Sequence, residues 1–315
     1  MKPIKIGTRG SALALWQAKT VAALIQKTGV HTEIVVIKTG GDRLQDAPLS
    51  NAGGKGLFVK EIEDALLAGE IDVAVHSAKD MSAILPDGLS IAAVLPREDP
   101  RDALVLGRGN SAIDFEGALA HIGEMPAIGT GSVRRIAQLA ALLPHARFTP
   151  IRGNVDTRLR KLDAGDYEAL VLAAAGLRRL GFESRISTTI PVEVCVPAPG
   201  QGIVAIETRG DDRSVRDAVS PMSDRDAAAA LAAERAVVAA LGGGCQLPLG
   251  VMAEHGRDSL TVQGVVAWPD GRGMIRRTST GLATEPAAAG ARLADELLRA
   301  GADQILSAVR TGVTP

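Results

Sequence analysis

The feature that most constrains this 315-residue chain is the alternation of strand-like and helix-like segments over its first two thirds. In the first hundred residues, short β-branched runs alternate with segments whose apolar residues recur at helical spacing. We expect strands at 4–7, 33–39, 71–75 and 89–95, and helices at 11–28 and 57–68. Ser11 is a suitable N-cap for the first helix, and Gly29 suits its end. This order is typical of a mainly parallel sheet with helices on both faces.

A second set of the same kind follows the segment 97–101. Strands are expected at 103–106, 127–129, 148–151, 169–172 and 186–190, and helices at 132–143, 156–163 and 175–180. A Pro/Gly-rich segment at 196–202 then leads into a strand at 203–208. The simplest arrangement returns the chain to the first unit there. Two linkers would then join two α/β units, with a cleft between them.

From about Ser223 the pattern changes to that of an α+β unit. An Ala-rich helix runs to Leu241, and a glycine-rich loop follows. Strands are expected at 251–253, 260–268 and 274–280, and a final helix at 286–299. Aromatic residues make up only 2% of the chain, so its cores must be built from Ala, Val, Leu and Ile. The predicted domains are 1–98 with 202–220, then 102–197, then 223–315.

Composition excludes several classes of protein. The net charge of −1 gives no global field for nucleic acid or a membrane surface, and no apolar run approaches the roughly 20 residues that span a bilayer. Cys195 and Cys245 are too few for a disulfide framework and lack metal-ligand spacing. The N-terminus shows no signal-peptide pattern. We therefore expect a cytoplasmic protein with no metal, nucleic-acid or membrane partner, and nothing requires more than a monomer.

Polar residues stand where predicted strands end, which is the edge at which open α/β sheets bind ligands. Free amides beside Arg9 and Ser11 favour an anion site, although a capped turn with an exposed arginine explains the same pattern. Asp80 follows another strand, next to Lys79 and close to His76. Such a carboxylate can stabilise a developing cation or exchange a proton with an amine. The alternative is an aspartate that caps a turn.

A glycine-rich segment around Lys55 lacks the spacing of a phosphate-binding P-loop. It suits either a loop that lays a cation over a bound anion or a plain surface loop. Cys245 also lies among glycines, which free the backbone to bring its sulfur to a ligand. A lone cysteine is more often a buried packing residue. Cys195 is expected to be one of those.

Arginines gather in the second unit, at 134–135, 152–158 and 178–179. Arg134 and Arg135 fall in the first turn of a predicted helix, where the helix dipole disfavours a cation. Since a guanidinium binds carboxylates through two parallel hydrogen bonds, arginines that converge on a cleft indicate a ligand with several carboxylates. An Arg-rich composition is the competing explanation. A nucleic-acid backbone is disfavoured by the overall charge and the scarce aromatic residues.

Several longer motifs resemble those of the porphobilinogen deaminase family, in order along essentially the whole chain. They lie at 7–18, 53–61, 76–80, 97–102, 152–154, 200–202 and 243–246. The resemblance implies two periplasmic-binding-protein-like α/β domains with crossing linkers and a third α+β domain with a cofactor loop. It also implies stepwise condensation of four porphobilinogen molecules to hydroxymethylbilane, with release of ammonia, on a covalent dipyrromethane primer. The partners would be porphobilinogen and the growing oligopyrrole.

The resemblance also implies roles for particular residues. Cys245 would carry the dipyrromethane through a thioether, and Asp80 would be the catalytic group. Cofactor contacts would come from Lys55, Ser77, Lys79, Asp80, Thr130, Ser132, Arg134, Arg135 and Arg158. Substrate contacts would come from Arg9, Ser11, Gln17, Phe58, Arg152, Arg179 and Gln201.

The chain departs from the family pattern at four places. Asn51 replaces a frequent lysine, and Gly131 replaces a common serine. Ala78 and Met81 flank the Lys79-Asp80 pair as apolar replacements, which we expect to affect packing only. The competing hypothesis for function is a two-domain carboxylate-binding protein without catalysis, which would need neither Cys245 nor a third domain.

Overall fold

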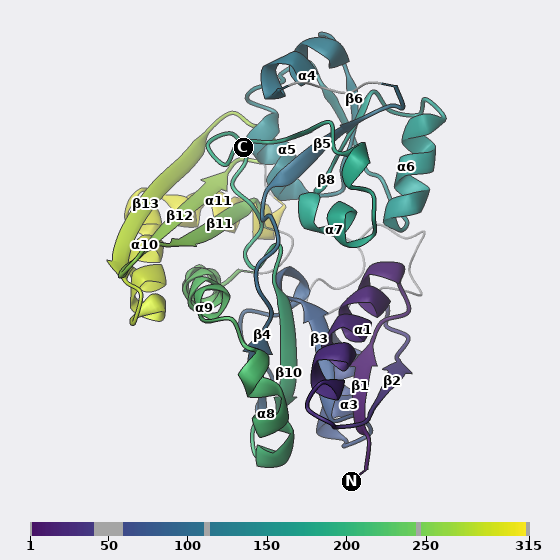
Figure 1. Ribbon diagram of the computed structural model, residues 1–315. Coiled ribbons are helices and arrows are strands. Elements are labelled where there is room, and N and C mark those ends of the chain that lie inside the picture. The colour runs from purple at the N-terminus through teal and green to yellow at the C-terminus, as the bar shows by residue number, and fades with distance from the viewer. Residues whose placement is uncertain (1, 41–58, 110–113, 244–246, 313–315) are drawn as a thin grey trace.

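Three sheets organise the molecule. The structure, a computed structural model, describes residues 2–40, 59–109, 114–243 and 247–312. Two five-stranded sheets with flanking helices lie one above the other in Figure 1, and a three-stranded sheet lies to one side. The expected fold class is confirmed, with two α/β units and a third α+β unit.

The first sheet is mixed rather than mainly parallel. Its strands are, in spatial order, β2 (Thr32–Val36), β1 (Ile4–Thr8), β3 (Val73–Ser77), β10 (Val204–Arg209) and β4 (Leu89–Val94). β1 pairs in parallel with β2 and β3, whereas β10 runs antiparallel to β3 and β4. The difference arises because β10 returns from the second unit in the opposite direction. The accompanying elements are α1 (Ala12–Gln26), α3 (Lys60–Leu67), η2 (Ala78–Asp80), α8 (Arg213–Val219) and η4 (Ser220–Met222).

The second sheet repeats this arrangement. Its order is β7 (Arg147–Thr149), β6 (Ala127–Gly129), β8 (Ala169–Ala173), β5 (Asp102–Leu106) and β9 (Thr188–Thr189). β6 pairs in parallel with β7 and β8, and β5 is antiparallel to β8 and β9. Its helical elements are α4 (Phe115–Ile122), α5 (Val133–Leu139), α6 (Val155–Asp163), α7 (Ala174–Arg179) and η3 (Glu183–Arg185). The sequence analysis missed α4, which contains Gly117 and depends on a cap by Asp114, whose side chain accepts from the Gly117 amide.

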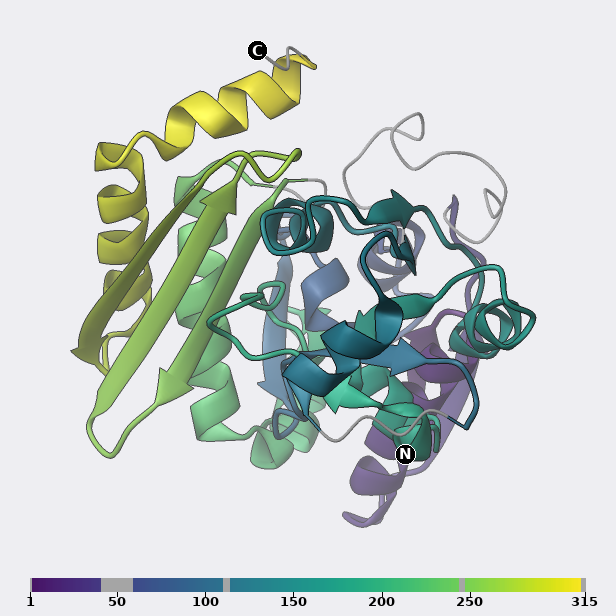
Figure 2. The same ribbon diagram turned by 90° about the horizontal axis from the view of Figure 1, so that it is seen from above.

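The third unit pairs an antiparallel sheet with a layer of helices. The sheet consists of β11 (Leu249–His255), β12 (Ser259–Ala267) and β13 (Met274–Leu282). Its apolar face packs against α9 (Arg225–Ala240), α10 (Pro286–Arg299) and α11 (Ala302–Thr311), as Figure 2 shows. The sequence pattern predicted that α10 would be the final helix, and this prediction is wrong. Gly301 adopts a φ of 93° and breaks the helical path, and α11 begins directly after it.

Local capping fixes where two long helices, α1 and α9, begin. The Ser11 hydroxyl accepts a hydrogen bond from the Ala14 amide at the start of α1, as the sequence predicts. Asp224 plays the same part for α9, because its carboxylate accepts from the Ala227 amide at 2.8 Å. Both helices therefore begin at fixed positions relative to the sheets.

The two linkers, residues 97–101 and 196–202, run against each other between the α/β units. The Glu98 amide donates to the Gly202 carbonyl at 3.0 Å. Gly202 has a φ of 87°, and a Cβ at this position would collide with the Glu98 carbonyl oxygen. Only glycine accommodates both the dihedral angle and the close approach.

Glu234 of α9 ties the third unit to both linkers. Its buried carboxylate accepts from the Arg97 guanidinium at 2.6 Å, from the Gly200 amide at 2.5 Å and from the Ala253 amide at 2.8 Å. Strands β3 and β10 stay in one sheet on one side of the crossing, and β5 and β8 lie on the other. The domain boundaries stay a prediction, supported by the separate apolar clusters of the three sheets.

We expect Gly202→Ala to lower the free energy of unfolding by about 2–4 kcal/mol, since the strain of a positive φ adds to a backbone collision. Gly165→Ala is the matched control, because Gly165 has a φ of 86° but nothing within 4 Å of its would-be Cβ. That control should lose only about 1 kcal/mol. Urea unfolding of both variants measures the difference. Equal losses would show that the linker contact contributes nothing.

Candidate active site

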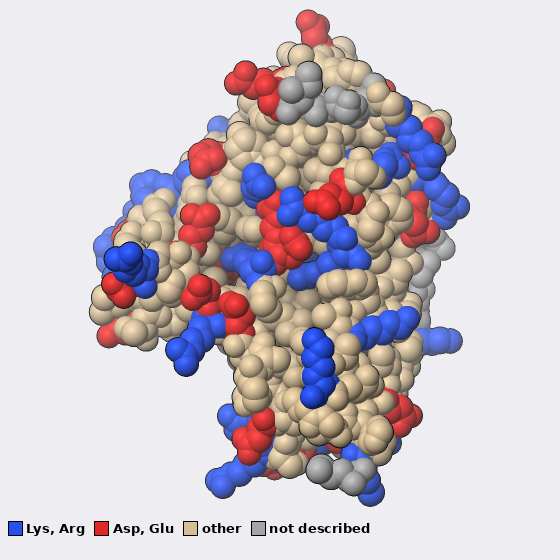
Figure 3. All heavy atoms as spheres, in the orientation of Figure 1, with Lys and Arg blue, Asp and Glu red and all other residues tan. Residues whose placement is uncertain are grey.

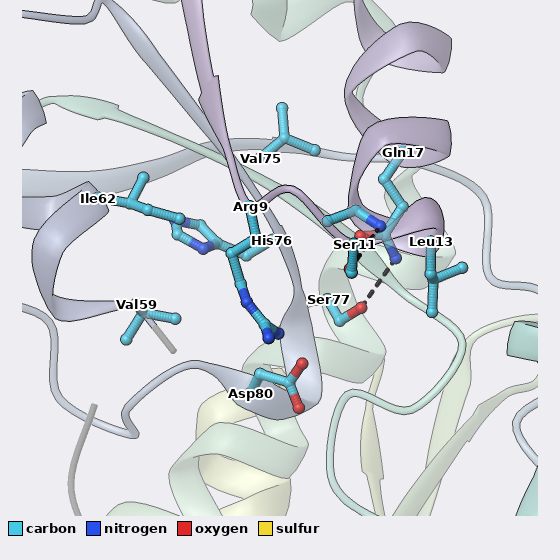
Figure 4. A pocket seen from close by; sticks show the side chains of 11 residues that line it. Arg9, Ser11, Leu13, Gln17, Val59, Ile62, Val75, His76, Ser77 and Asp80 are labelled. Carbon is cyan, nitrogen blue, oxygen red and sulfur yellow. Dashed lines mark hydrogen bonds between the residues drawn. The ribbon is translucent and has the colours of Figure 1, made fainter. Parts of the chain in front are cut away.

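A pocket opens where β1 and β3 end in the first sheet. Its polar lining comes from the loop after β1, from α1 and from the turn after β3, and it consists of Arg9, Ser11, Gln17, His76, Ser77 and Asp80. Figure 4 shows these side chains around one space, with the apolar Val59, Ile62 and Val75 behind them. The structure therefore brings together five of the residues that the sequence analysis named, along with His76.

Asp80 is held by the geometry of the chain around it. It ends η2, which follows β3 directly, and it is half-buried. In Figure 4 the Arg9 guanidinium points toward the Asp80 carboxylate. Gln17 of α1 donates to the Ser77 hydroxyl at 2.8 Å and so links the helix to the end of β3. A carboxylate beside a guanidinium in a half-enclosed pocket suits the handling of a positive charge and a proton.

His76 is not a neighbour of the Asp80 carboxylate in the way the sequence pattern indicated. Its Nε2 lies 3.1 Å from Oε2 of Glu207 on β10, and both side chains are buried. β10 pairs with β3 and so brings Glu207 to this position. Sequence reasoning missed Glu207 because the pairing joins segments 131 residues apart.

Arg134 and Arg135 are buried in the first turn of α5, where both bind the carboxylate of Asp102. Nη1 of Arg134 lies 2.7 Å from Oδ2 of Asp102. Nε and Nη2 of Arg135 lie 3.0 and 2.8 Å from Oδ1. Arg134 also donates to the Val196 carbonyl at 2.7 Å. The helix dipole disfavours cations in the first turn of a helix. At this position the Asp102 carboxylate binds both of them.

Cys195 lies in the same buried cluster, as the prediction of a packing thiol requires. Its side chain is fully buried, and Nη1 of Arg134 lies 3.3 Å from its sulfur. Burial raises the pKa of the Cys195 thiol to about 12. The thiol is therefore not a nucleophile near neutral pH.

Gln201 connects this cluster to the turn that carries Asp80. Its Nε2 donates to Oδ1 of Asp102 at 2.9 Å, and its Oε1 accepts from Nζ of Lys79 at 3.4 Å. The pKa of Lys79 is lowered to about 8, chiefly by burial and also by repulsion from Arg135 and Arg134, while attraction by Asp80 and Asp102 limits the shift.

Arg158 of α6 lies among other cations. It is half-buried, and Nε donates to the Gly153 carbonyl at 2.8 Å. Burial lowers the pKa of Arg158 to about 10, with repulsion from Arg135 and Arg152 as the further causes. The sequence-predicted Arg135 and Arg152 are therefore each close enough to Arg158 to repel it. The hydroxyls of Thr130 and Ser132 lie just before α5, where Ser132 caps the helix.

Arg179 reaches from α7 toward both the linker and the first unit. Its Nη2 donates to the Gly202 carbonyl at 2.7 Å. Its guanidinium lies 5.5 Å from the ring centre of Trp16 on α1, a cation–π distance. A second pair of this kind joins Arg272 and Trp268 in the third unit, at 4.1 Å.

Some sequence-predicted residues lie outside the described residues. These are Lys55, Phe58, Cys245 and the departure at Asn51. Of the other departures, Ala78 and Met81 are buried in one apolar cluster. Gly131 has room for a Cβ, with only the Ile151 carbonyl oxygen at 3.7 Å.

Charged side chains of both signs gather at mid-height on the face shown in Figure 3. Ion pairs join the first linker to the end of α7. Arg178 lies 3.0 Å from Glu98 and 3.3 Å from Asp99, and Arg101 lies 2.8 Å from Asp99.

Within the described ranges, no helix is long and apolar enough to cross a membrane. The same ranges contain no group of three His, Cys, Asp or Glu side chains that could hold a metal ion.

Fold and site together define a class: an α/β protein whose two crossing linkers adjoin a cluster of cationic side chains. Residues 4–217 match the sequence model described as "Porphobilinogen deaminase, dipyromethane cofactor binding domain". Residues 228–299 match "Porphobilinogen deaminase, C-terminal domain". The chain belongs to the porphobilinogen deaminase family.

Individual relatives are similar in sequence to this chain along nearly its whole length. The porphobilinogen deaminase of Geobacter metallireducens is 46% identical over 98% of this chain and 95% of its own. That of Syntrophotalea carbinolica is 45% identical over 99% of this chain and 98% of its own. Among solved structures, the methionine binding protein MetQ is 14% identical, with a TM-score of 0.43, over 70% of this chain and 89% of that one.

The predicted family, activity and cofactor are confirmed. The chain is a transferase of tetrapyrrole biosynthesis, with the hydroxymethylbilane synthase activity of its family and a dipyrromethane cofactor. The residues present fit that cofactor. The donors of Arg134, Arg135, Arg158 and Lys79 suit its carboxylates, and the buried Nε of Arg134 has no hydrogen-bond partner among the described residues.

Lys79 offers a direct test of the electrostatics. We expect its amine to titrate near pH 8 in Cys245→Ser protein, where the proposed attachment sulfur is absent and no cofactor carboxylate adds to the field. Lysines carrying ¹³C-methyl groups can be titrated by NMR, and Lys79→Arg identifies the signal. Because burial disfavours the charged amine in the folded state, the free energy of unfolding should rise between pH 8 and 10.5, where only the unfolded chain still binds this proton. A midpoint above pH 10 would contradict the burial of this cation.

Proposed function

We propose that the cations of the cleft hold the dipyrromethane and the incoming porphobilinogen by their carboxylates, while Asp80 handles the charge and protons of the reaction. The observation that carries the proposal is the group of Arg135, Arg152 and Arg158. Repulsion and burial lower the pKa of Arg158 within this group. Like charges held this close favour a bound polyanion, which relieves their repulsion.

The proposed assignment keeps two sets of residues. Cofactor contacts are assigned to Lys55, Ser77, Lys79, Asp80, Thr130, Ser132, Arg134, Arg135 and Arg158. Substrate contacts are assigned to Arg9, Ser11, Gln17, Phe58, Arg152, Arg179 and Gln201. Support comes from the shared pocket of Arg9, Ser11, Gln17, Ser77 and Asp80, and from the link of Lys79 to Gln201.

Asp80 has the place and the chemistry for the proton steps. The bound cofactor supplies the pyrrole carbon to which the first substrate unit is joined. The Asp80 carboxyl group can protonate the departing amine of porphobilinogen, and as carboxylate it can stabilise the cation that remains on the substrate. The same oxygens can accept the proton that leaves when the new carbon–carbon bond has formed. Arg9 would hold a substrate carboxylate beside them.

Cys245 is proposed as the tether. It lies between α9, which ends at Ala240, and β11, which begins at Leu249. Glu234 of α9 binds both linkers, so the tethered loop begins on a helix that is fixed to the crossing. We further propose that the enzyme is a monomer, which light scattering of the purified protein tests.

Intact-mass measurement tests the tether. We expect the purified protein to exceed its sequence mass by one dipyrromethane, because a thioether survives denaturation. Cys245→Ala should have the unmodified mass. Cys195→Ala is the matched control and should keep the excess, since the Cys195 thiol is buried with a raised pKa. An unmodified mass in active wild-type protein would refute the cofactor assignment to Cys245.

Asp80→Asn tests the catalytic group. The amide keeps the size of the side chain but can neither donate nor accept the proton, so we expect porphobilinogen turnover to fall by more than about 100-fold. Folding should be unchanged by circular dichroism and urea unfolding, because Asp80 is only half-buried. Turnover within a few-fold of wild type would remove Asp80 from the proton steps.

A further inference from the structure

A single buried carboxylate stands at the centre of the cationic site. Asp102, the first residue of β5, is 0% exposed. Its Oδ2 accepts from Arg134, and its Oδ1 accepts from Arg135 and from Gln201, at distances of 2.7 to 3.0 Å. Both oxygens are therefore fully occupied by donors from α5 and from the second linker. No oxygen of this side chain is left for a ligand.

The charges around Asp102 are unequal, since one anion faces two guanidiniums. Burial alone would raise the pKa of Asp102, but Arg134 and Arg135 hold it well below its ordinary range. The carboxylate is thus ionised under all physiological conditions. One surplus positive charge remains, and Lys79 lies within the field of the same groups. The cluster as a whole stays cationic toward its surroundings.

An anion in a site that binds carboxylates is unfavourable unless it is bound to the cations of the site. Free in the cleft, it would repel the acetate and propionate groups of pyrroles. Bound through both oxygens, it holds Arg134 at Nη1 and Arg135 at both Nε and Nη2, so neither guanidinium is free to turn as a flexible arginine would. Arg135 is fixed on a further edge by the Val171 carbonyl at 2.9 Å.

The same carboxylate also reaches the catalytic turn. Gln201 donates to Asp102 with its amide nitrogen and accepts from Lys79 with its amide oxygen. Its nitrogen also donates to the Pro100 carbonyl at 2.7 Å, so it joins the two linkers. Lys79 precedes Asp80 directly. A continuous path of hydrogen bonds therefore runs from α5 through Asp102 and Gln201 to the neighbour of Asp80.

We propose that Asp102 is a positioning residue, which orients Arg134 and Arg135 toward the bound pyrroles and, through Gln201, sets the place of Lys79 beside Asp80. The proposal rests on the function proposed above for these cations. It adds a second acidic residue beside Asp80 to the assigned site. It also gives the linker residue Gln201 a task besides contact with the substrate.

The first test measures the electrostatic effect of Asp102 on Lys79 and does not depend on turnover. In Cys245→Ser protein with ¹³C-methylated lysines, Asp102→Asn should lower the titration midpoint of Lys79 below its value near pH 8, because the anion that favours its charge is gone. Leu106→Ala, at the far end of β5, is the matched control. It removes a buried side chain without changing a charge, so its Lys79 midpoint should stay near pH 8. An unchanged midpoint in Asp102→Asn would overturn the proposal.

The second test keeps the charge and moves it. Asp102→Glu, in protein with Cys245 intact, displaces the carboxylate by one methylene. We expect kcat/KM for porphobilinogen to fall by at least about 10-fold while the protein stays folded, with the larger part of the loss in KM, since the displaced cations bind carboxylates less well. Leu106→Ala should keep kcat/KM within about threefold of wild type. A wild-type kcat/KM in Asp102→Glu would refute the positioning role, and this variant decides alone if Asp102→Asn does not fold.

The two tests separate the two proposals. Retained turnover in Asp80→Asn would refute the proposed role of Asp80, whereas the Lys79 midpoints would still decide whether Asp102 governs this site. Normal wild-type turnover with unchanged midpoints in Asp102→Asn would leave the function intact and remove Asp102 from it.

Discussion

The contact between the two linkers is the constraint on which the rest of the structure depends. Because the chain leaves the first sheet before β5 and comes back as β10, each α/β unit is completed only when both crossings are in place. Gly202 lets the crossings touch at Glu98, and Glu234 holds Arg97 of one linker and the Gly200 amide of the other. Beside this contact, Gln201 links the cluster around Asp102 to Lys79, the neighbour of Asp80.

The electrostatics of the site follow from that arrangement. Cations that occupy separate segments of the sequence are brought within range of one another, and burial makes their charges costly. Arg158 and Lys79 both show this in their lowered pKa values. Asp102 offsets part of the repulsion within the protein, and a polyanionic ligand would offset the remainder. In the proposed function, binding of the ligand therefore lowers the electrostatic cost of these buried cations.

Much of the fold could be predicted because its signals are local. A few adjacent residues are enough to predict the cap at Ser11, the Pro/Gly-rich second linker and the turn between β12 and β13. The direction of β10 could not be predicted, since strand patterns carry no sign of parallel or antiparallel pairing. α4 and α11 were missed because Gly117 and Gly301 interrupt the patterns that mark a helix. Glu207 and Asp102 were missed because their partners lie far away along the chain. An acidic residue at the head of the apolar run 103–106 was the one available signal for Asp102.

The scarcity of aromatic residues has an optical consequence. The chain contains two tryptophans, and each lies against an arginine, Trp16 under Arg179 and Trp268 under Arg272. Indole emission therefore arises from two points only. One of them lies where α1 of the first unit meets α7 of the second, and the other lies in the third unit. With Trp268 replaced by phenylalanine, the remaining indole would be a native fluorophore that reports the separation of the two α/β units, with no attached dye.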